Sequence, residues 1–371
     1  MAIPSINNIN SPFKFLDFYK KEDGDIFFGR EEEVNELYTR IHETNLVLLY
    51  GASGTGKTSI INCGLNNEFE PSDWLPIYIR RQSNLIDSIL EQIQHFAIQK
   101  KPINADILVQ LESLYLDYFK PTYLIIDQFE EIFILGSKEE QEDFFRLLAR
   151  ILNKRGLKCK VIISMREEYL AYLSDFEYII PTLFDNRLRI EKMHTNKLRE
   201  VIIGTLHAFG IHMAPSEDIP NEIIKALRDK NHEVDLANLQ VYLDRLYRIE
   251  YERQIAEKRE DTYFDKKLLA QAGNFENVMS LFLDEQILIL ENELKIKGIQ
   301  QKGLPIELLF FMVTDNGTKQ SVEIEDIKKQ MSHRPEVSGE IIDYCINFFK
   351  SIRIVRELSS QITKITDNAM A

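Results

Sequence analysis

Three observations predict an α/β fold for the first half of this chain and helical domains for the second half. Up to about residue 190, short and almost continuously apolar segments alternate with longer amphipathic ones, as in a parallel sheet covered by helices on both faces. From there on, amphipathic segments follow one another without strands between them. The last segments give the order helix, helix, helix and β-hairpin, which is typical of a winged helix. We therefore expect a sheet domain at 1–192, an α-helical domain at 193–275 and a winged-helix-like domain at 276–371.

The expected strands of the first half are its short apolar runs, at 45–50, 75–79, 123–126 and 160–164. The expected helices show apolar residues at helical spacing, at 31–42, 59–66, 85–99 and 139–153. The same spacing predicts helices in the second half at 195–209, 220–229, 235–258, 277–297, 306–314, 324–331 and 338–351, before strands at 353–357 and 361–365. Asp235 is placed to cap a helix. We expect the acidic run Glu139–Glu142 to be a solvated helix face, and Phe13, Phe15 and Phe18 to pack on the sheet domain.

Composition excludes several classes of protein. The 371 residues carry a formal net charge of −14, which argues against a nucleic-acid partner. No apolar run is long enough to span a membrane, and the first ten residues lack the basic and apolar regions of a secretory signal. The three cysteines, Cys63, Cys159 and Cys345, are too dispersed for a disulfide framework or a zinc site. We expect a cytoplasmic protein with buried thiols.

A phosphate-binding motif follows the first expected strand. Residues 51–58 read GASGTGKT, which fits G-x-x-x-x-G-K-[ST] between a buried strand and a helix. Glycines let backbone N–H groups turn toward one anion at a helix N-terminus, Lys57 supplies a cation for the β- and γ-phosphates, and the Thr58 hydroxyl is a ligand for Mg²⁺. The fold class is thus an α/β P-loop NTPase, and the residues expected to bind nucleotide are Gly51, Ser53, Gly54, Thr55, Gly56, Lys57, Thr58 and Ser59. A guanine-reading motif is absent from the sequence, so ATP and ADP are the expected nucleotides.

The second half of the expected site is YLIIDQFEE at 123–131, an apolar strand that ends in an aspartate. Asp127 would hold Mg²⁺ through water, and a carboxylate a few residues later would polarise the attacking water. Glu131 is the first choice for this acid and Glu130 the second. The alternative is that both are exposed acids that open a helix and favour its dipole.

Two arginines complete the candidate site. Arg166 follows the fourth expected strand, and at this edge of a parallel sheet it points toward the phosphates and can sense the γ-phosphate. The alternative for Arg166 is a surface ion pair with Glu167 or Glu168. Arg30 precedes the first helix, where the corresponding segment of some P-loop ATPases packs over the adenine.

The segments FFGRE, GASGTGKTSIINCGL, YLIIDQFEEIF and IISMREEYL, in this order, resemble the STAND class of P-loop ATPases. The similarity is greatest to the bacterial novel STAND NTPases, an AAA+- and NACHT-like group, and continues weakly through 239–247 and 313–319. The resemblance implies a slow regulatory ATPase in bacterial signal transduction or antiviral defence. In such proteins ADP holds a closed monomer, a trigger opens it, ATP replaces ADP, and a homo-oligomer activates an effector. The sequence shows neither an effector nor a sensor-repeat region.

Carried over residue by residue, the resemblance assigns residues 51–58 to the Walker A motif and Asp127 and Glu131 to the Walker B motif. It also assigns Arg166 to the arginine after the fourth strand and Arg30 to the adenine side. Two departures stand out. Residues 236–240 lack the proline that the family carries near the adenine. The segment Gly303-Leu304-Pro305 contains a proline, but it lies later in the chain than the family's proline. Thr366 stands where a histidine normally contacts the ADP β-phosphate, which predicts a weaker ADP latch.

Three other functions compete with the switch ATPase. An initiator-type AAA-like ATPase with a DNA-binding winged helix has the same motifs, but residues 303–371 carry eight Lys and Arg against ten Asp and Glu. A small-molecule kinase would need an arginine-rich lid, and the sequence shows no such pattern. A nucleotide-binding protein without catalysis is disfavoured by the intact Lys57, Asp127 and Glu131.

Overall fold

The structure is a computed structural model, and it describes residues 11–15, 17–100, 102, 105–228, 233–273, 275–299, 303–313, 320, 322–334, 337–352, 354–359 and 362–365. The chain divides into two compact units. Residues Phe18–Thr205 form the first, which we call the α/β unit; the described residues before Phe18 and from Leu206 onward form the helical unit. Within the described residues, none of the helices has the length and apolar character needed to cross a membrane.

The α/β unit is built on a five-stranded sheet in which all neighbouring strands are parallel. Its strands lie in the order β2-β3-β4-β1-β5, so β4 separates β1 from β3. Their bounds are β1 Leu46–Gly51, β2 Leu75–Ile79, β3 Thr122–Ile126, β4 Cys159–Arg166 and β5 Arg187–Arg189. The predicted parallel sheet is confirmed with its four predicted strands. The fifth strand was not expected, because only one of its three residues is buried.

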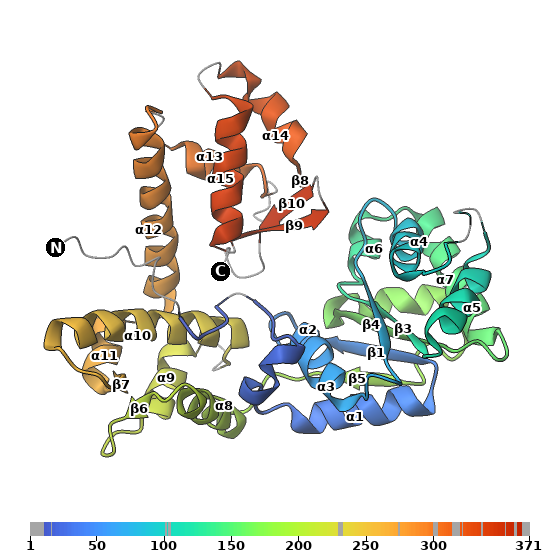
Figure 1. The fold of residues 1–371 in the computed structure, drawn as a ribbon, viewed down its shortest axis with the longest axis horizontal. Helices are drawn as coiled ribbons and strands as arrows, with labels where there is room; N and C mark the ends of the chain where they lie inside the picture. Colours follow the sequence, from blue (N-terminus) through green and yellow to red (C-terminus); the bar gives the residue numbers. More distant parts are fainter. Residues whose placement is uncertain are drawn as a thin grey trace. The chain divides into compact units, whose positions relative to one another are not determined.

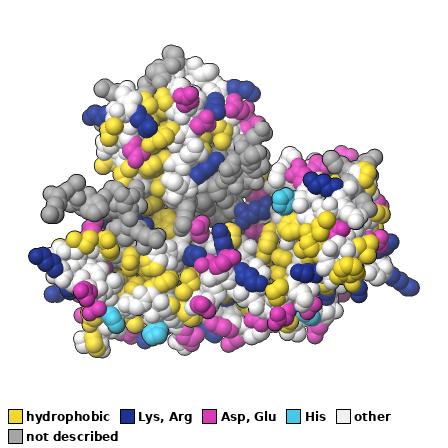
Figure 2. Space-filling model, in the orientation of Figure 1, with side chains coloured by type: hydrophobic (Ala, Val, Ile, Leu, Met, Phe, Trp, Pro, Cys, Tyr) yellow, Lys and Arg dark blue, Asp and Glu magenta, His cyan; other side chains and the backbone are white. Residues whose placement is uncertain are grey.

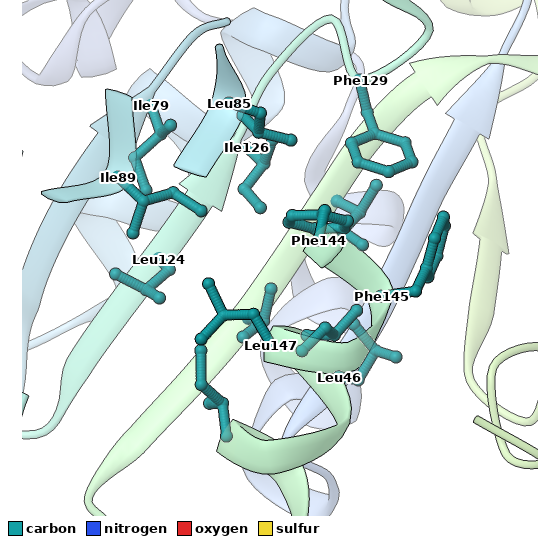
Figure 3. Close-up of a cluster of buried hydrophobic side chains, with 14 of the residues drawn as sticks. Leu46, Ile79, Leu85, Ile89, Leu124, Ile126, Phe129, Phe144, Phe145 and Leu147 are labelled. Atoms are coloured by element: carbon teal, nitrogen blue, oxygen red, sulfur yellow. The ribbon is translucent and has the colours of Figure 1, made fainter. Parts of the chain in front are cut away.

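The strands are buried on both faces, and alternate residues belong to different cores. One core joins Leu48, Ile77 and Ile163 to the helices between β2 and β4. Figure 3 shows Ile79, Leu124 and Ile126 of the sheet facing side chains of these helices. The other core joins Val47, Leu49 and Ile125 to α1 (Glu31–Glu43) and to the helical segment after β1. The two sets of helices therefore lie on opposite sides of the sheet (Figure 1).

The helices of the α/β unit follow the predicted pattern, with two additions that the sequence analysis did not expect, α5 and α6. Amphipathic helices α1, α4 and α7 lie where they were expected, each with one end shifted by one to three residues. Their bounds are α1 Glu31–Glu43, α2 Lys57–Ser59, α3 Asn66–Glu68, α4 Leu85–Phe96, α5 Ile107–Tyr118, α6 Glu131–Leu135 and α7 Lys138–Asn153. A π-helical turn, Ile60–Leu65, joins α2 to α3, and 3₁₀ segments lie at Lys21–Ile26 and Glu167–Phe176.

The helical unit contains the remaining helices and three short pairings of strands (Figure 1). The Asp235 side chain accepts a hydrogen bond from the Ala237 N–H and caps α10 as expected. The helices are α8 Thr195–Ala208, which begins in the α/β unit, α9 Ile219–Leu227, α10 Leu236–Glu257, α11 Lys266–Ala272, α12 Phe275–Ile296, α13 Leu304–Phe310, α14 Ile324–Gln330 and α15 Gly339–Ser351, with a 3₁₀ turn at Met331–His333. The strands are β6 His212–Met213, β7 Tyr263–Phe264, β8 Val322–Glu323, β9 Val355–Ser359 and β10 Ile362–Ile365.

The expected position was wrong for two of the three N-terminal aromatic residues, Phe13 and Phe15, whereas Phe18 is the first residue of the α/β unit. Phe13 packs edge-on against Phe209 and Tyr247, and Phe15 contacts Phe282, so both belong to the helical unit and not to the sheet. These apolar rings fit a helical core as well as a sheet surface, and the sequence pattern carries no information on which core receives them.

The acidic run at the start of α7 is not wholly solvated. Glu140 is buried, and its carboxylate accepts two hydrogen bonds of 2.8 Å from the Arg81 guanidinium and one from the Leu85 N–H. This buried ion pair joins the loop after β2 to α7. The expectation failed at this residue because Arg81, which provides the compensating charge, is 59 residues away in sequence.

Replacing Glu140 with alanine is expected to cost about 3–5 kcal/mol of unfolding free energy, because it leaves the Arg81 charge buried without a partner. Burial alone would raise the pKa of Glu140, but the hydrogen bonds from Arg81 and Leu85 lower it overall. The stability that the carboxylate provides is therefore present at neutral pH and is lost as the pH falls through this lowered pKa. Urea unfolding at neutral and acidic pH measures both effects. Glu139→Ala, at an exposed position of the same run, is the control and should change little.

Candidate functional site

The loop between β1 and α2 approaches other backbone very closely. A side-chain carbon on Gly51 would lie 2.2 Å from the carbonyl oxygen of Ile190, in the segment after β5. Gly54 and Gly56 both have positive φ angles, of 74° and 89°, which a residue with a side chain adopts only under strain. The three glycines of the motif are therefore required by the shape of this loop, which places backbone N–H groups at the start of the helix.

Lys57, the first residue of α2, extends along the loop. Its ammonium group donates hydrogen bonds of 2.8 Å to the carbonyl oxygens of Gly51 and Ala52. Burial lowers the pKa of Lys57, while the nearby carboxylates of Glu130 and Asp127 act to raise it. The loop, its lysine and the acids after β3 therefore form one electrostatic cluster.

Asp127 lies at the carboxyl end of β3, where it contacts two other side chains. Its Oδ2 atom accepts a hydrogen bond of 3.0 Å from the Thr58 hydroxyl and one of 3.1 Å from Nη2 of Arg80. Arg80 follows β2, the strand beside β3. Arg80 was not among the predicted site residues, although the sequence contains a signal for it. Arg80 directly follows an apolar strand, as Asp127 does, and the carboxyl ends of parallel strands share one edge.

Glu130 and Arg166 form an ion pair at the same edge of the sheet. Arg166 ends β4 opposite Gly51 of β1, and its Nε atom lies 3.1 Å from Oε1 of Glu130. The Arg166 backbone N–H also donates to Oε2 of that carboxylate. Burial raises the pKa of Glu130, although the charge of Arg166 opposes this. The Glu130 side chain of this pair is buried, and that of Arg166 is 35% exposed.

Arg30 is buried, and its guanidinium group contacts protein backbone. Its Nη2 atom donates hydrogen bonds of 2.8 Å to the carbonyl oxygens of Thr55 and Glu191, and Nη1 pairs with Glu33. Arg30 thus connects the start of α1 to the phosphate-binding loop and to the segment after β5. These contacts give it a role in fixing the loop.

Only some of the predicted site residues lie together at one edge of the sheet. Lys57, Thr58, Asp127, Glu130 and Arg166 come together at the carboxyl edge of the sheet. The hydroxyl of Ser59 instead accepts a hydrogen bond from the Tyr19 N–H, and the buried hydroxyl of Thr55 donates to the carbonyl of Ala52, so each stabilises protein structure. Glu131 is buried at the first turn of α6, and Thr366 lies outside the described residues.

The residues around Asp127 suit Mg²⁺ bound together with phosphates. A hydroxyl and a carboxylate oxygen lie 3.0 Å apart, and both are hard ligands of the kind that Mg²⁺ prefers. Across the described residues, His, Cys, Asp and Glu side chains nowhere gather in threes or more as a self-contained metal site.

Solved structures with a similar chain path include a Walker-type ATPase of Pyrococcus abyssi, at 16% identity and a TM-score of 0.47 over 98% of both chains. The ORC1 protein of Aeropyrum pernix in complex with DNA has 16% identity and a TM-score of 0.47 over 92% of this chain and 89% of that one. The ADP form of ORC2 from the same organism has 13% identity and a TM-score of 0.48 over 99% and 94%.

Among curated proteins, the chromosomal replication initiator protein DnaA of Buchnera aphidicola subsp. Baizongia pistaciae (strain Bp) is 20% identical over 216 residues. The match covers 56% of this chain and 42% of the relative, so the chain spans less than half of that protein's length. A sequence model of the novel STAND NTPase 1 family matches residues 12–279, which include the phosphate-binding loop and the charged residues after β3 and β4. This P-loop protein belongs to the novel STAND NTPase 1 family.

Proposed function

We propose that this protein binds ATP with Mg²⁺, hydrolyses it slowly, and uses the exchange between ADP and ATP as a conformational switch. The observation that carries the proposal is the hydrogen bond between Thr58, on the phosphate-binding helix, and Asp127, at the end of β3. It places the two protein groups that Mg²⁺ would need beside a loop shaped for phosphates.

The residues of the site would have different roles in ATP hydrolysis. Backbone N–H groups of the loop would hold the β-phosphate, and Lys57 would leave the carbonyls of Gly51 and Ala52 for the β- and γ-phosphate oxygens. Thr58 and Asp127 would hold Mg²⁺, which when bound neutralises charge on those oxygens. Arg166, opposite Gly51, would add a positive charge near the γ-phosphate.

Glu130 is the better candidate for the residue that polarises water, in place of our first choice from sequence, Glu131. Among the charges that act on the Lys57 ammonium group, that of Glu130 has the largest effect. The Glu130 carboxylate also pairs with Arg166, at the end of the strand between β1 and β3. Both observations support Glu130 as the acid nearer to the expected γ-phosphate.

The helical unit would supply the switch. Helices α13, α14 and α15 precede β9 and β10, which pair antiparallel with each other, and β10 also pairs antiparallel with β8. This order supports a winged-helix-like domain at the C-terminus. We propose that it closes over ADP, that ATP releases it, and that the opened protein forms a homo-oligomer that acts on an effector in bacterial signalling or antiviral defence.

The nucleotide released by denaturing the freshly purified protein tests the switch. Chromatography is expected to show about one ADP per chain, as a closed state that retains its product would give. Thr366→His is expected to slow ADP release, because a histidine adds a cation beside the β-phosphate. An empty protein that does not take up ADP or ATP would refute the function, and an unchanged release rate would refute the role of Thr366.

An initiator-like function is the second candidate, because the curated relative is a replication initiator and the C-terminal elements fit a winged helix. Lys and Arg are interspersed with Asp and Glu on the face that Figure 2 presents, which does not favour DNA binding. A gel shift with duplex DNA at low salt separates the two functions. Tight binding that salt abolishes would favour the initiator.

A further inference from the structure

Arg80 and Asp127 occupy equivalent places on neighbouring strands. Ile79, the last residue of β2, is in register with Ile126, the last residue of β3. Arg80 and Asp127 are therefore the next residues of each strand, and the Asp127 N–H is held by the carbonyl of Ile79 at 3.0 Å. This register brings a guanidinium group to a carboxylate without any contribution from a flexible loop.

One oxygen of Asp127 accepts hydrogen bonds from both Arg80 and Thr58, at 3.1 Å and 3.0 Å. The Asp127 side chain is 12% exposed, so its negative charge requires a nearby positive one. Arg80 supplies that charge in this structure. Mg²⁺ bound with nucleotide would also act on Asp127, and two cations would then compete for one carboxylate.

The backbone beside Arg80 is fixed, but its side chain is not enclosed. The next residue, Arg81, donates to Glu140 and to the carbonyls of Gln82 and Ser83, which anchors the loop after β2. The Arg80 side chain itself is 30% exposed. Its guanidinium group can therefore leave Asp127 by a change of side-chain rotamers, without moving the strand.

We propose that Arg80 is a displaceable counter-cation of Asp127. It neutralises the carboxylate when Mg²⁺ is absent, and the entry of Mg²⁺ with nucleotide displaces it. Arg80 thereby sets how strongly nucleotide binding depends on Mg²⁺. This inference rests on the proposed nucleotide-binding function and adds a role in metal dependence to the same site.

The test is the dissociation constant of a fluorescent ADP analogue, measured in excess EDTA and in excess Mg²⁺. For Arg80→Met the ratio of the EDTA value to the Mg²⁺ value should rise about tenfold. Without metal the variant lacks the positive charge that neutralises Asp127, whereas with metal a competitor for this carboxylate is removed. Arg80→Lys keeps the charge and should keep the ratio. Arg146→Met, on the exposed face of α7, removes an equivalent charge far from the site and should also keep it.

A double variant shows whether the effect passes through Asp127. In an Asp127→Asn background, Arg80→Met should leave the ratio unchanged, because the carboxylate that both cations share is gone. An unchanged ratio in Arg80→Met alone would overturn the proposal. So would a fall in the ratio, which would show that Arg80 binds the phosphates of the metal-bound nucleotide. A wild-type protein that binds no nucleotide under either condition would overturn the proposed function and the role of Arg80 together.

Discussion

Glu130→Gln is expected to lower ATP turnover by about a hundredfold or more and to leave ATP affinity within about threefold, because loss of a positioned base removes two to four orders of magnitude in rate. Glutamine keeps the size of the side chain and can still accept hydrogen bonds from Arg166, which preserves the local structure. Single-turnover hydrolysis of radiolabelled ATP, together with ATP affinity from equilibrium binding, separates the rate from the affinity.

Glu131→Gln is the matched control, since it makes the same chemical change at the next residue. Glu131 is also buried, so a general effect of losing an acid at the start of α6 would appear in both variants. We expect turnover in Glu131→Gln to stay within about tenfold of wild type. A large loss of turnover in this variant, with Glu130→Gln close to wild type, would reverse the assignment.

The sequence predicts most of the architecture around this site for a simple physical reason. Strands β1 to β4 are covered by helices on both faces, so nearly every residue in them is apolar and the runs are visible. β5 has the sequence Arg-Leu-Arg at the edge of the sheet, with a single buried side chain, and carries no such signal. The motifs at 51–58 and 123–131 are contiguous and can therefore be recognised without a fold.

What the sequence could not decide depends on distances between separate strands. The choice between Glu130 and Glu131 follows from the turn after β3, where Gln128 has a positive φ angle of 57° that its residue type does not predict. The contact between Arg80 and Asp127 requires that β2 lie beside β3, and strand order is not visible in any single segment. The burial of Glu140 was not predicted for the same reason, because its partner, Arg81, lies in the loop after β2.

Gly51→Ala is expected to lower the free energy of unfolding of the α/β unit by about 3 kcal/mol, at the upper end of overpacking effects, and to weaken ATP binding at least about tenfold. The added carbon would lie 2.2 Å from the Ile190 carbonyl oxygen, and this neighbour is main chain, which has no rotamer to change. Ile190 is itself fixed, because its N–H donates to the carbonyl of Tyr50 at 2.7 Å. One of the two segments must therefore shift. A shift of Gly51 also moves the carbonyl oxygen to which Lys57 donates a hydrogen bond.

Gly339→Ala separates this steric effect from the general effect of adding a methyl group to a glycine. Gly339 begins α15, and its added carbon would make only ordinary contacts of 3.6 Å with the flexible side chain of Lys328. Alanine is the better helix former, so this control should be neutral or slightly stabilising. Urea unfolding and ATP binding, measured for both Gly51→Ala and Gly339→Ala, test whether the steric contact at Gly51 has this effect. If Gly51→Ala bound ATP like wild type, the shape of the loop after β1 would not depend on its contact with the segment after β5.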